Sequence, residues 1–241
     1  MSKSYGVFAE YYDRLTSNAE YKKRAEYMEG FFNFSDKSKR KVLDLACGTG
    51  SICKEFADMG YDVTGLDLSE EMLSIASTKA NIRLLKHDMR NFNFENEFDA
   101  CVCAFDSLNH LETLEDWKKC FFSVYSSLKD GGIFVFDVNT IYKHNNILAD
   151  NAFIFDEDDF FLAWDNEGLE NNKVRILLDF FIFNGENYDR QSEEFVESAF
   201  SVDEIKDALA DYFTLDGVYD DMTRNAPAAE SQRLYFVCKR K

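Results

Sequence analysis

Prolines and long apolar runs are scarce in this chain of 241 residues. Pro227 is the single proline, and no segment approaches the roughly 18 consecutive apolar residues that a membrane-spanning helix needs. The first residues also lack the apolar core of a secretory signal peptide. We therefore expect a cytoplasmic protein that does not insert into a membrane.

The six cysteines lack the spacing of a metal site. None of them forms a Cys-x-x-Cys pair, and most lie within apolar segments. Cysteines in such positions are typical of buried free thiols, so the sequence predicts neither zinc nor a disulfide. We expect no metal cofactor.

The chain has fewer basic than acidic residues. The chain has 45 acidic and 27 basic residues, a formal net charge of −18, and its few basic clusters are short. Nucleic acids and anionic membranes bind basic patches, so both are disfavoured as partners. The acidity itself indicates solubility, and selection of a cationic substrate stays open as an alternative.

The segment from Val42 to Gly50 is the most informative part of the sequence. It reads Val-Leu-Asp-Leu-Ala-Cys-Gly-Thr-Gly, an apolar strand followed by a glycine loop, and a helix is expected from Ser51. A strand, a glycine loop and a helix start together indicate a nucleotide-type cofactor, either a dinucleotide or S-adenosylmethionine (SAM).

Asp44 favours SAM over a dinucleotide. A carboxylate at this strand end would repel a pyrophosphate, whereas it stabilises the ammonium and sulfonium of SAM. Cys53 also occupies the third glycine position of the dinucleotide fingerprint. Asp67 stands about 20 residues after the loop, where either cofactor class places an acid for its ribose hydroxyls. We therefore expect SAM, with NAD as the alternative.

The remaining chain alternates short apolar strands with helical stretches, which predicts a parallel sheet. Helices are expected over 51–59, 69–79 and 111–128, and a further helix from Ser201 to Leu209 before a closing strand pair at 213–219 and 233–239. Residues 139–199 instead read as antiparallel strands, with turns at 165–168 and 184–185. This insertion follows the fifth strand, at the sheet edge where ligands bind, and is predicted to act as a lid.

Five ordered motifs resemble those of class I SAM-dependent methyltransferases. They start at Asp44, Thr64, His87, Phe98 and Asp130, and the segment Phe8-Ala9-Glu10-Tyr11-Tyr12-Asp13 is similar to the opening of small bacterial members. The resemblance implies an α/β fold with a Rossmann-like, mostly parallel seven-stranded sheet flanked by helices. Residues 1–138 and 200–241 would form the SAM-binding core, with 139–199 as the antiparallel lid.

The resemblance also implies a set of cofactor-binding residues. Asp44 and the loop glycines would contact the methionine part of SAM, Asp67 the ribose, Leu68 the adenine ring, and Asp88 with Met89 the adenine edge. Asp88 as a helix cap is the structural alternative. The full set is Tyr12, Asp44, Ala46, Gly48, Gly50, Asp67, Leu68, Asp88, Met89 and Ala104.

The loop after the fourth strand, residues 104–110, stands closest to the transferred methyl in this family. Asp106 or His110 is therefore a candidate general base for an acceptor hydroxyl or amine. His110 also stands near an expected helix start, so capping or packing is the alternative. The loop lacks the Asn/Asp-Pro-Pro-Tyr/Phe pattern of enzymes that methylate DNA bases or protein glutamine.

The sequence thus predicts a methyltransferase that moves a methyl group from SAM to a small-molecule oxygen or nitrogen by in-line displacement. A protein or tRNA methyltransferase is one alternative, which a basic docking face would favour. A non-catalytic SAM-binding regulatory domain is another, which a sealed site without an acceptor cavity would favour.

Overall fold

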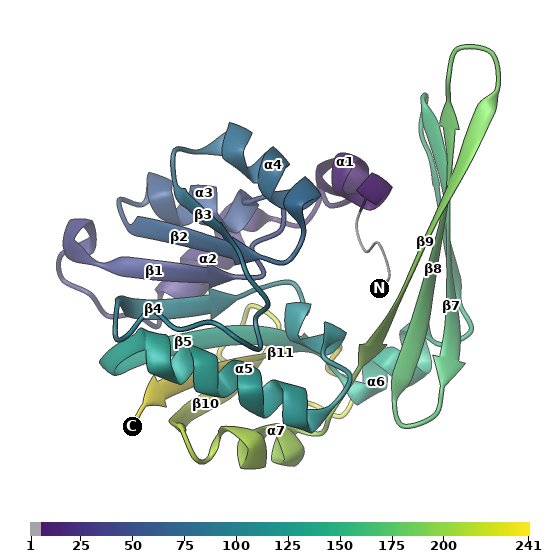
Figure 1. Cartoon of the computed structure of the whole chain (residues 1–241). Coiled ribbons are helices and arrows are strands. Elements are labelled where there is room, and N and C mark those ends of the chain that lie inside the picture. Colours follow the sequence, from purple (N-terminus) through teal and green to yellow (C-terminus); the bar gives the residue numbers. More distant parts are fainter. Residues whose placement is uncertain (1–5) are drawn as a thin grey trace.

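The computed structural model describes residues 6–241, and two β-sheets organise them (Figure 1). The larger sheet has seven strands in the order β10-β11-β5-β4-β1-β2-β3. Six of them run in the same direction, and only β11 is reversed, pairing antiparallel with both β5 and β10. The strands are β1 (Lys41–Leu45), β2 (Asp62–Asp67), β3 (Arg83–Lys86), β4 (Phe98–Cys103), β5 (Leu128–Asn139), β10 (Phe213–Asp220) and β11 (Arg233–Arg240). The predicted seven-stranded, mostly parallel sheet is confirmed.

Helices cover both faces of this sheet (Figure 1). One face packs against α5 (Leu114–Ser127) and α7 (Val202–Leu209), with Trp117 and Phe121 fully buried. The other face packs against α2 (Tyr21–Glu29) and α3 (Ser51–Asp58). Each layer buries its apolar side chains against the strands, which is why the short hydrophobic strands of the sequence lie in the core. No helix within residues 6–241 combines the length and apolarity that crossing a membrane requires.

One predicted helix start is confirmed and one moves, and in both cases a polar side chain caps the helix. α4 (Glu70–Lys79) begins after Ser69, whose hydroxyl accepts the Met72 N–H. α5 begins after Thr113, whose hydroxyl accepts the Asp116 N–H, so the expected start at Leu111 is wrong. A residue that caps a helix in this way satisfies one of its free N–H groups and sets the first turn.

The insertion after β5 forms the second sheet, with strands in the order β6-β7-β8-β9. It is antiparallel throughout, as predicted. Its elements are α6 (Ile141–Lys143), the short helix η3 (His144–Leu148), β6 (Ala152–Asp156), β7 (Phe160–Leu169), β8 (Lys173–Phe183) and β9 (Tyr188–Ser198).

One predicted turn in this sheet is wrong. Residues 165–168 lie inside β7 and pair with β8, and the chain reverses at 170–172 instead. Asn171 and Asn172 have φ angles of 61° and 59° there, a left-handed conformation that asparagine tolerates. The predicted turn at Gly185 is present, with a φ of 99°.

Helix α1 (Gly6–Leu15) joins the second sheet to the core (Figure 1). Phe8 and Tyr11 pack among Phe160 and Phe180 of the second sheet, and Met72 of α4 belongs to the same cluster. Arg14 also pairs with Asp159 at 2.7 Å. The sheet is thereby held beside the carboxyl ends of the core strands. The division into a core and a lid stays a prediction, and residues 1–5 of the predicted core lie outside the described residues.

Candidate active site

The glycine loop between β1 and α3 has an unusual backbone. Ala46, Gly48 and Gly50 have φ angles of 55°, 52° and 76°. A Cβ at Gly48 would meet only the Met72 sulfur, at 4.0 Å, so the backbone there is open to a ligand. A Cβ at Gly50 would lie 2.8 Å from that of Ala76. Gly50 thus permits close packing of α4 and does not line the main cavity, and its cofactor contact stays a prediction.

Asp67 lies at the end of β2 and faces the loop. Its carboxylate accepts the Gly48 N–H at 2.8 Å and the Ser69 N–H at 2.9 Å, while burial raises its pKa. The next residue, Leu68, is 57% exposed although it is a large apolar side chain. A hydrogen-bond acceptor beside an uncovered apolar surface suits the ribose and the adenine ring of a nucleoside.

Asp44 lies on β1, behind the glycine loop. It is 2% exposed and accepts a hydrogen bond from the Cys53 thiol at 3.0 Å. Burial raises its pKa to about 7. It lines a small cavity of about 30 Å³ together with Tyr12, Ala46 and Ala104. A cation near Asp44 would therefore favour its ionised form.

Tyr12 connects this small cavity with a larger one, because its side chain lines both. Burial raises the pKa of Tyr12 well above 10, so its hydroxyl stays protonated. The neighbouring Asp13 ties α1 to the glycine loop. It accepts the Thr49 hydroxyl at 2.6 Å and pairs with Lys79 at 2.5 Å.

Asp88 and Met89 follow β3 and line the larger cavity. Asp88 pairs with Arg90 at 2.6 Å, and this ion pair holds the pKa of Asp88 below its ordinary value. No helix begins at Asp88, so the alternative that it serves as a helix cap is wrong.

The larger cavity has a volume of about 570 Å³ and joins the two sheets. One end is lined by Gly48, Asp67, Leu68, Asp88 and Met89. The other end is lined by residues of the loop after β4, of β5, α6 and β11, and of the second sheet, among them Asp106, His110, Asn139, Lys143, Trp164, Phe195, Glu197 and Arg233. Most of the predicted cofactor residues and both candidate catalytic residues thus line one space, with room for a second molecule beside the nucleoside end, whereas Asp44 and Ala104 line the small cavity.

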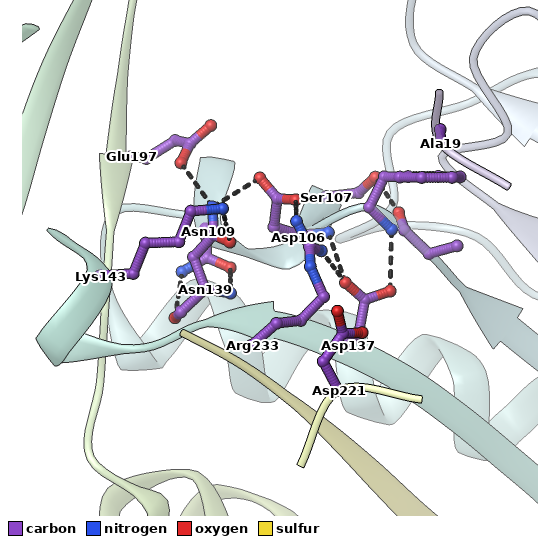
Figure 2. A network of polar contacts seen from close by, with 12 residues as sticks. Ala19, Asp106, Ser107, Asn109, Asp137, Asn139, Lys143, Glu197, Asp221 and Arg233 are labelled. Carbon is purple, nitrogen blue, oxygen red and sulfur yellow. Dashed lines mark hydrogen bonds and ion pairs between the residues drawn. The ribbon is translucent and has the colours of Figure 1, made fainter. Parts of the chain in front are cut away.

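Asp137 holds the loop after β4 in a left-handed conformation. Phe105 and Asp106 have φ angles of 57° and 51°, and their N–H groups donate to the Asp137 carboxylate at 2.8 and 3.1 Å. Arg233 of β11 contacts the carboxylates of both Asp137 and Asp106 (Figure 2). A buried guanidinium between two carboxylates compensates their desolvation.

This ion pair changes the role expected for Asp106. Burial alone raises its pKa, but the charge of Arg233, together with that of Lys143, overrides burial and lowers the pKa of Asp106 to about 2. A carboxylate with such a pKa is a poor proton acceptor near neutral pH. Its environment therefore argues against Asp106 as the general base and favours a permanently ionised group.

His110 lies at the end of the short helix η2 (Ser107–His110), and Thr113 caps α5, so the expected capping role of His110 is wrong. Its side chain is 29% exposed and lines the cavity. The His110 Nε2 atom lies 3.9 Å from Glu197 Oε1, and its ring lies against Phe195 at 5.1 Å between centroids. His110 thus remains a candidate base.

Four polar residues at the far end of the cavity were not predicted: Asn139, Lys143, Glu197 and Arg233. Asn139 ends β5 and Lys143 follows it, and the rule that ligands bind at the carboxyl edge of parallel strands was their only signal in the sequence. Glu197 and Arg233 come from antiparallel strands far along the chain. Their position depends on how those strands pack.

Comparison with known proteins identifies the family. Residues 42–132 match the family model of a methyltransferase domain. "Putative methyltransferase YqeM" of Bacillus subtilis (strain 168) is 39% identical over 243 residues, which cover 98% of this chain and 97% of that protein. The structure of a S-adenosylmethionine-dependent methyltransferase from Clostridium acetobutylicum ATCC 824 is 30% identical, has a TM-score of 0.85, and covers 96% of this chain and 97% of that one.

A more distant relative acts on a sugar. The dTDP-3-amino-3,6-dideoxy-alpha-D-glucopyranose N,N-dimethyltransferase of Streptomyces fradiae is 35% identical over 109 residues, 44% of this chain and 43% of that enzyme. The fold, the enzyme class and the cofactor predicted from the motifs are confirmed by these similarities together. The chain therefore belongs to the SAM-dependent methyltransferases.

Proposed function

We propose that this enzyme methylates a small molecule on nitrogen or oxygen, with nitrogen favoured. The single observation that carries the proposal is the continuous cavity of about 570 Å³. Its nucleoside end fits SAM, and its other end passes the loop after β4 and reaches the second sheet. SAM supplies an activated methyl group on a sulfonium, so the chain's task is to hold the acceptor atom in line with it.

The charges around the acceptor end favour an amine. Three carboxylates, those of Asp106, Asp137 and Glu197, stand against the cations of Arg233 and Lys143. An excess of buried negative charge favours a cationic or amino group. The Streptomyces fradiae relative, whose name describes N,N-dimethylation of an amino sugar, supports the same acceptor class.

His110 has the position of a proton acceptor. When a neutral amine or hydroxyl forms its bond to the methyl carbon, the carbon–sulfur bond breaks and the acceptor must lose one proton. His110 lines the cavity, with its Nε2 atom 3.9 Å from Glu197 Oε1, and an imidazole can accept that proton. Asp106, kept ionised by Arg233, would stabilise positive charge that develops on the acceptor.

The open cavity and the net charge argue against the two alternative functions. A regulatory domain without transfer activity would be expected to close the space beside the methyl, whereas here that space is open and lined with polar groups. A protein or tRNA substrate would favour a basic docking face, and the net charge of −18 argues against one.

A metabolite screen tests the proposal. Purified protein is incubated with methyl-labelled SAM and a small-molecule extract, and labelled products are identified by mass spectrometry. We expect a labelled amine or ether and S-adenosylhomocysteine as products. Label transfer only to protein or RNA fractions, or SAM binding with no transfer to any fraction, would contradict it.

A further inference from the structure

Lys143 is a cation in the cavity wall that has no role in the proposed reaction. It ends α6, immediately after β5, and its side chain extends toward Asn139 and Asp106 (Figure 2). Its ammonium donates one hydrogen bond, to Asn139 Oδ1 at 2.8 Å. An ammonium carries three donors, so two remain for a ligand.

The ammonium of Lys143 has no close counter-charge. Within residues 6–241, no carboxylate oxygen lies within 4.0 Å of its nitrogen. Arg233 in the same wall differs, because it contacts two carboxylates. Lys143 is therefore the cation of this site without a direct ion-pair partner, since the carboxylates of Asp106, Glu197 and Asp137 act on its charge only at longer range.

Asn139 keeps the opposite charges of this site apart (Figure 2). Its Oδ1 atom accepts from Lys143, while its Nδ2 atom donates to Asp106 at 2.8 Å and is 3.5 Å from Glu197. One amide thus faces a cation with its oxygen and two carboxylates with its nitrogen. The result is a wall with a positive group on one side of Asn139 and negative groups on the other.

Such a wall matches a ligand that carries both charges. Burial and the neighbouring Arg233 lower the pKa of Lys143 more than the charges of Asp106, Glu197 and Asp137 raise it, and an anion beside the ammonium would offset this lowering. We propose that Lys143 binds an anionic group, a carboxylate or a phosphate, on the methyl acceptor. The inference rests on the proposed function in assigning this anion to the acceptor, which would then be an amino acid-like or phosphorylated amine.

Two other roles for Lys143 make different predictions. If Lys143 binds the carboxylate of SAM itself, its removal weakens cofactor binding. If Lys143 is the general base, arginine cannot replace it, because arginine stays protonated, whereas arginine does pair with carboxylate and phosphate. The variants Lys143→Gln and Lys143→Arg therefore separate the three roles.

The test uses the full chain saturated with S-adenosylhomocysteine and three probe amines. β-Alanine carries a carboxylate, phosphoethanolamine a phosphate, and ethylamine neither. Saturation-transfer NMR measures binding of each probe to the wild type, to both Lys143 variants and to Lys118→Gln, a control that removes an exposed lysine from α5. We expect one anionic probe to bind at least tenfold more tightly than ethylamine.

The variants complete the test. We expect Lys143→Gln to lose at least tenfold in affinity for that probe, and Lys143→Arg and Lys118→Gln to stay within threefold of wild type. Affinity for S-adenosylhomocysteine should stay within threefold throughout. Equal binding of all probes, no probe binding, or undiminished binding by Lys143→Gln would overturn the proposal, as would a tenfold loss of cofactor affinity.

Methyl transfer is then assayed with the same probes and any acceptor found by the metabolite screen. A Lys143-dependent anion site without transfer to any amine would support the anion site and contradict the proposed function. Transfer to amines with an unchanged KM in Lys143→Gln would support the function and overturn the role of Lys143. A kcat lost equally in both Lys143 variants would identify a base instead.

Discussion

The guanidinium of Arg233 lies 2.5 Å from the carboxylate of Asp106, a residue 127 positions earlier in the chain. This contact joins β11, the last strand in the chain, to the loop after β4. The same guanidinium contacts Asp137, whose carboxylate accepts the N–H groups of that loop. The shape of the loop and the charge state of Asp106 therefore depend on one arginine.

Replacing this arginine should destabilise the protein. Arg233→Gln leaves Asp106 and Asp137 buried without a counter-charge, and breaking a buried pair costs about 3 to 5 kcal/mol. Arg175→Gln removes two ion pairs, with Glu167 and Glu194, whose arginine is 36% exposed, and should cost less than about 1 kcal/mol. Urea unfolding of both variants measures the difference, and equal losses would contradict the structural role of Arg233.

Gly50 should be sensitive to added volume as well as to backbone conformation. Gly50→Ala places a methyl group 2.8 Å from the Ala76 Cβ, whereas Gly60→Ala meets nothing within 4 Å. Both glycines have positive φ angles, 76° and 94°, so both variants share the backbone penalty of roughly 1 kcal/mol. We expect Gly50→Ala to lose at least about 1 kcal/mol more in thermal unfolding, as overpacking does. Equal losses of stability in the two variants would show that α4 shifts to accommodate the added methyl group.

Asp67 should be needed for cofactor binding. Asp67→Ala removes the acceptor for the ribose hydroxyls and frees the Gly48 N–H that it now holds. Charge-assisted hydrogen bonds contribute roughly 1.5 to 3 kcal/mol each, so affinity should fall at least about tenfold. Calorimetry with S-adenosylhomocysteine measures the change. Asp62→Ala, an exposed position at the other end of β2, is the control, and unchanged affinity in Asp67→Ala would remove Asp67 from the site.

The raised pKa of Asp44 should make the free energy of unfolding fall as pH rises. Its pKa in the folded chain is about 7, above the unfolded value of about 3.9. Between these two values the folded state holds the extra proton, so the free energy of unfolding falls with increasing pH, by at most about 1.4 kcal/mol per unit from this group. Asp44→Asn should remove this dependence, which unfolding measured from pH 4 to 8 would reveal. A parallel slope in wild type and variant would contradict the raised pKa.

The same substitution tests the expected contact with SAM. If Asp44 faces the ammonium of the cofactor, Asp44→Asn should weaken S-adenosylhomocysteine binding by about tenfold or more at pH 8, because the product keeps that ammonium. The variant would then gain stability and lose affinity. Unchanged affinity would place the ammonium elsewhere.

Replacing His110 should lower turnover and leave cofactor affinity unchanged. His110→Gln keeps a polar side chain but removes the proton acceptor, and loss of a general base commonly lowers kcat by about a hundredfold or more. His87→Gln is the matched control, since His87 lines the cavity just after β3, beside Asp88. If His110→Gln turns over an identified acceptor at the wild-type rate, His110 is not a general base. The chain would then contribute only by positioning the acceptor.

The sequence by itself determined the cofactor class and the architecture. The glycine loop, Asp44 and Asp67 are local patterns whose chemistry can be read without knowing the fold, and the alternation of strands and helices already implied a parallel sheet with an antiparallel insertion. The turn near residue 170 was misplaced because alternation marks a strand without setting its length. Pairing between β7 and β8 extends β7 past residues 165–168 to Leu169.

Only the tertiary structure decided the charges at the acceptor end. Asp106 reads in the sequence as a possible base, and its neighbour Arg233 becomes visible only when β11 pairs with β5. Lys143 and Glu197 reach the cavity from the two ends of the insertion, and Asn139 stands between them. The physical reason is that a pKa depends on burial and on charges a few ångströms away, and these distances are set by packing between segments far apart in the chain.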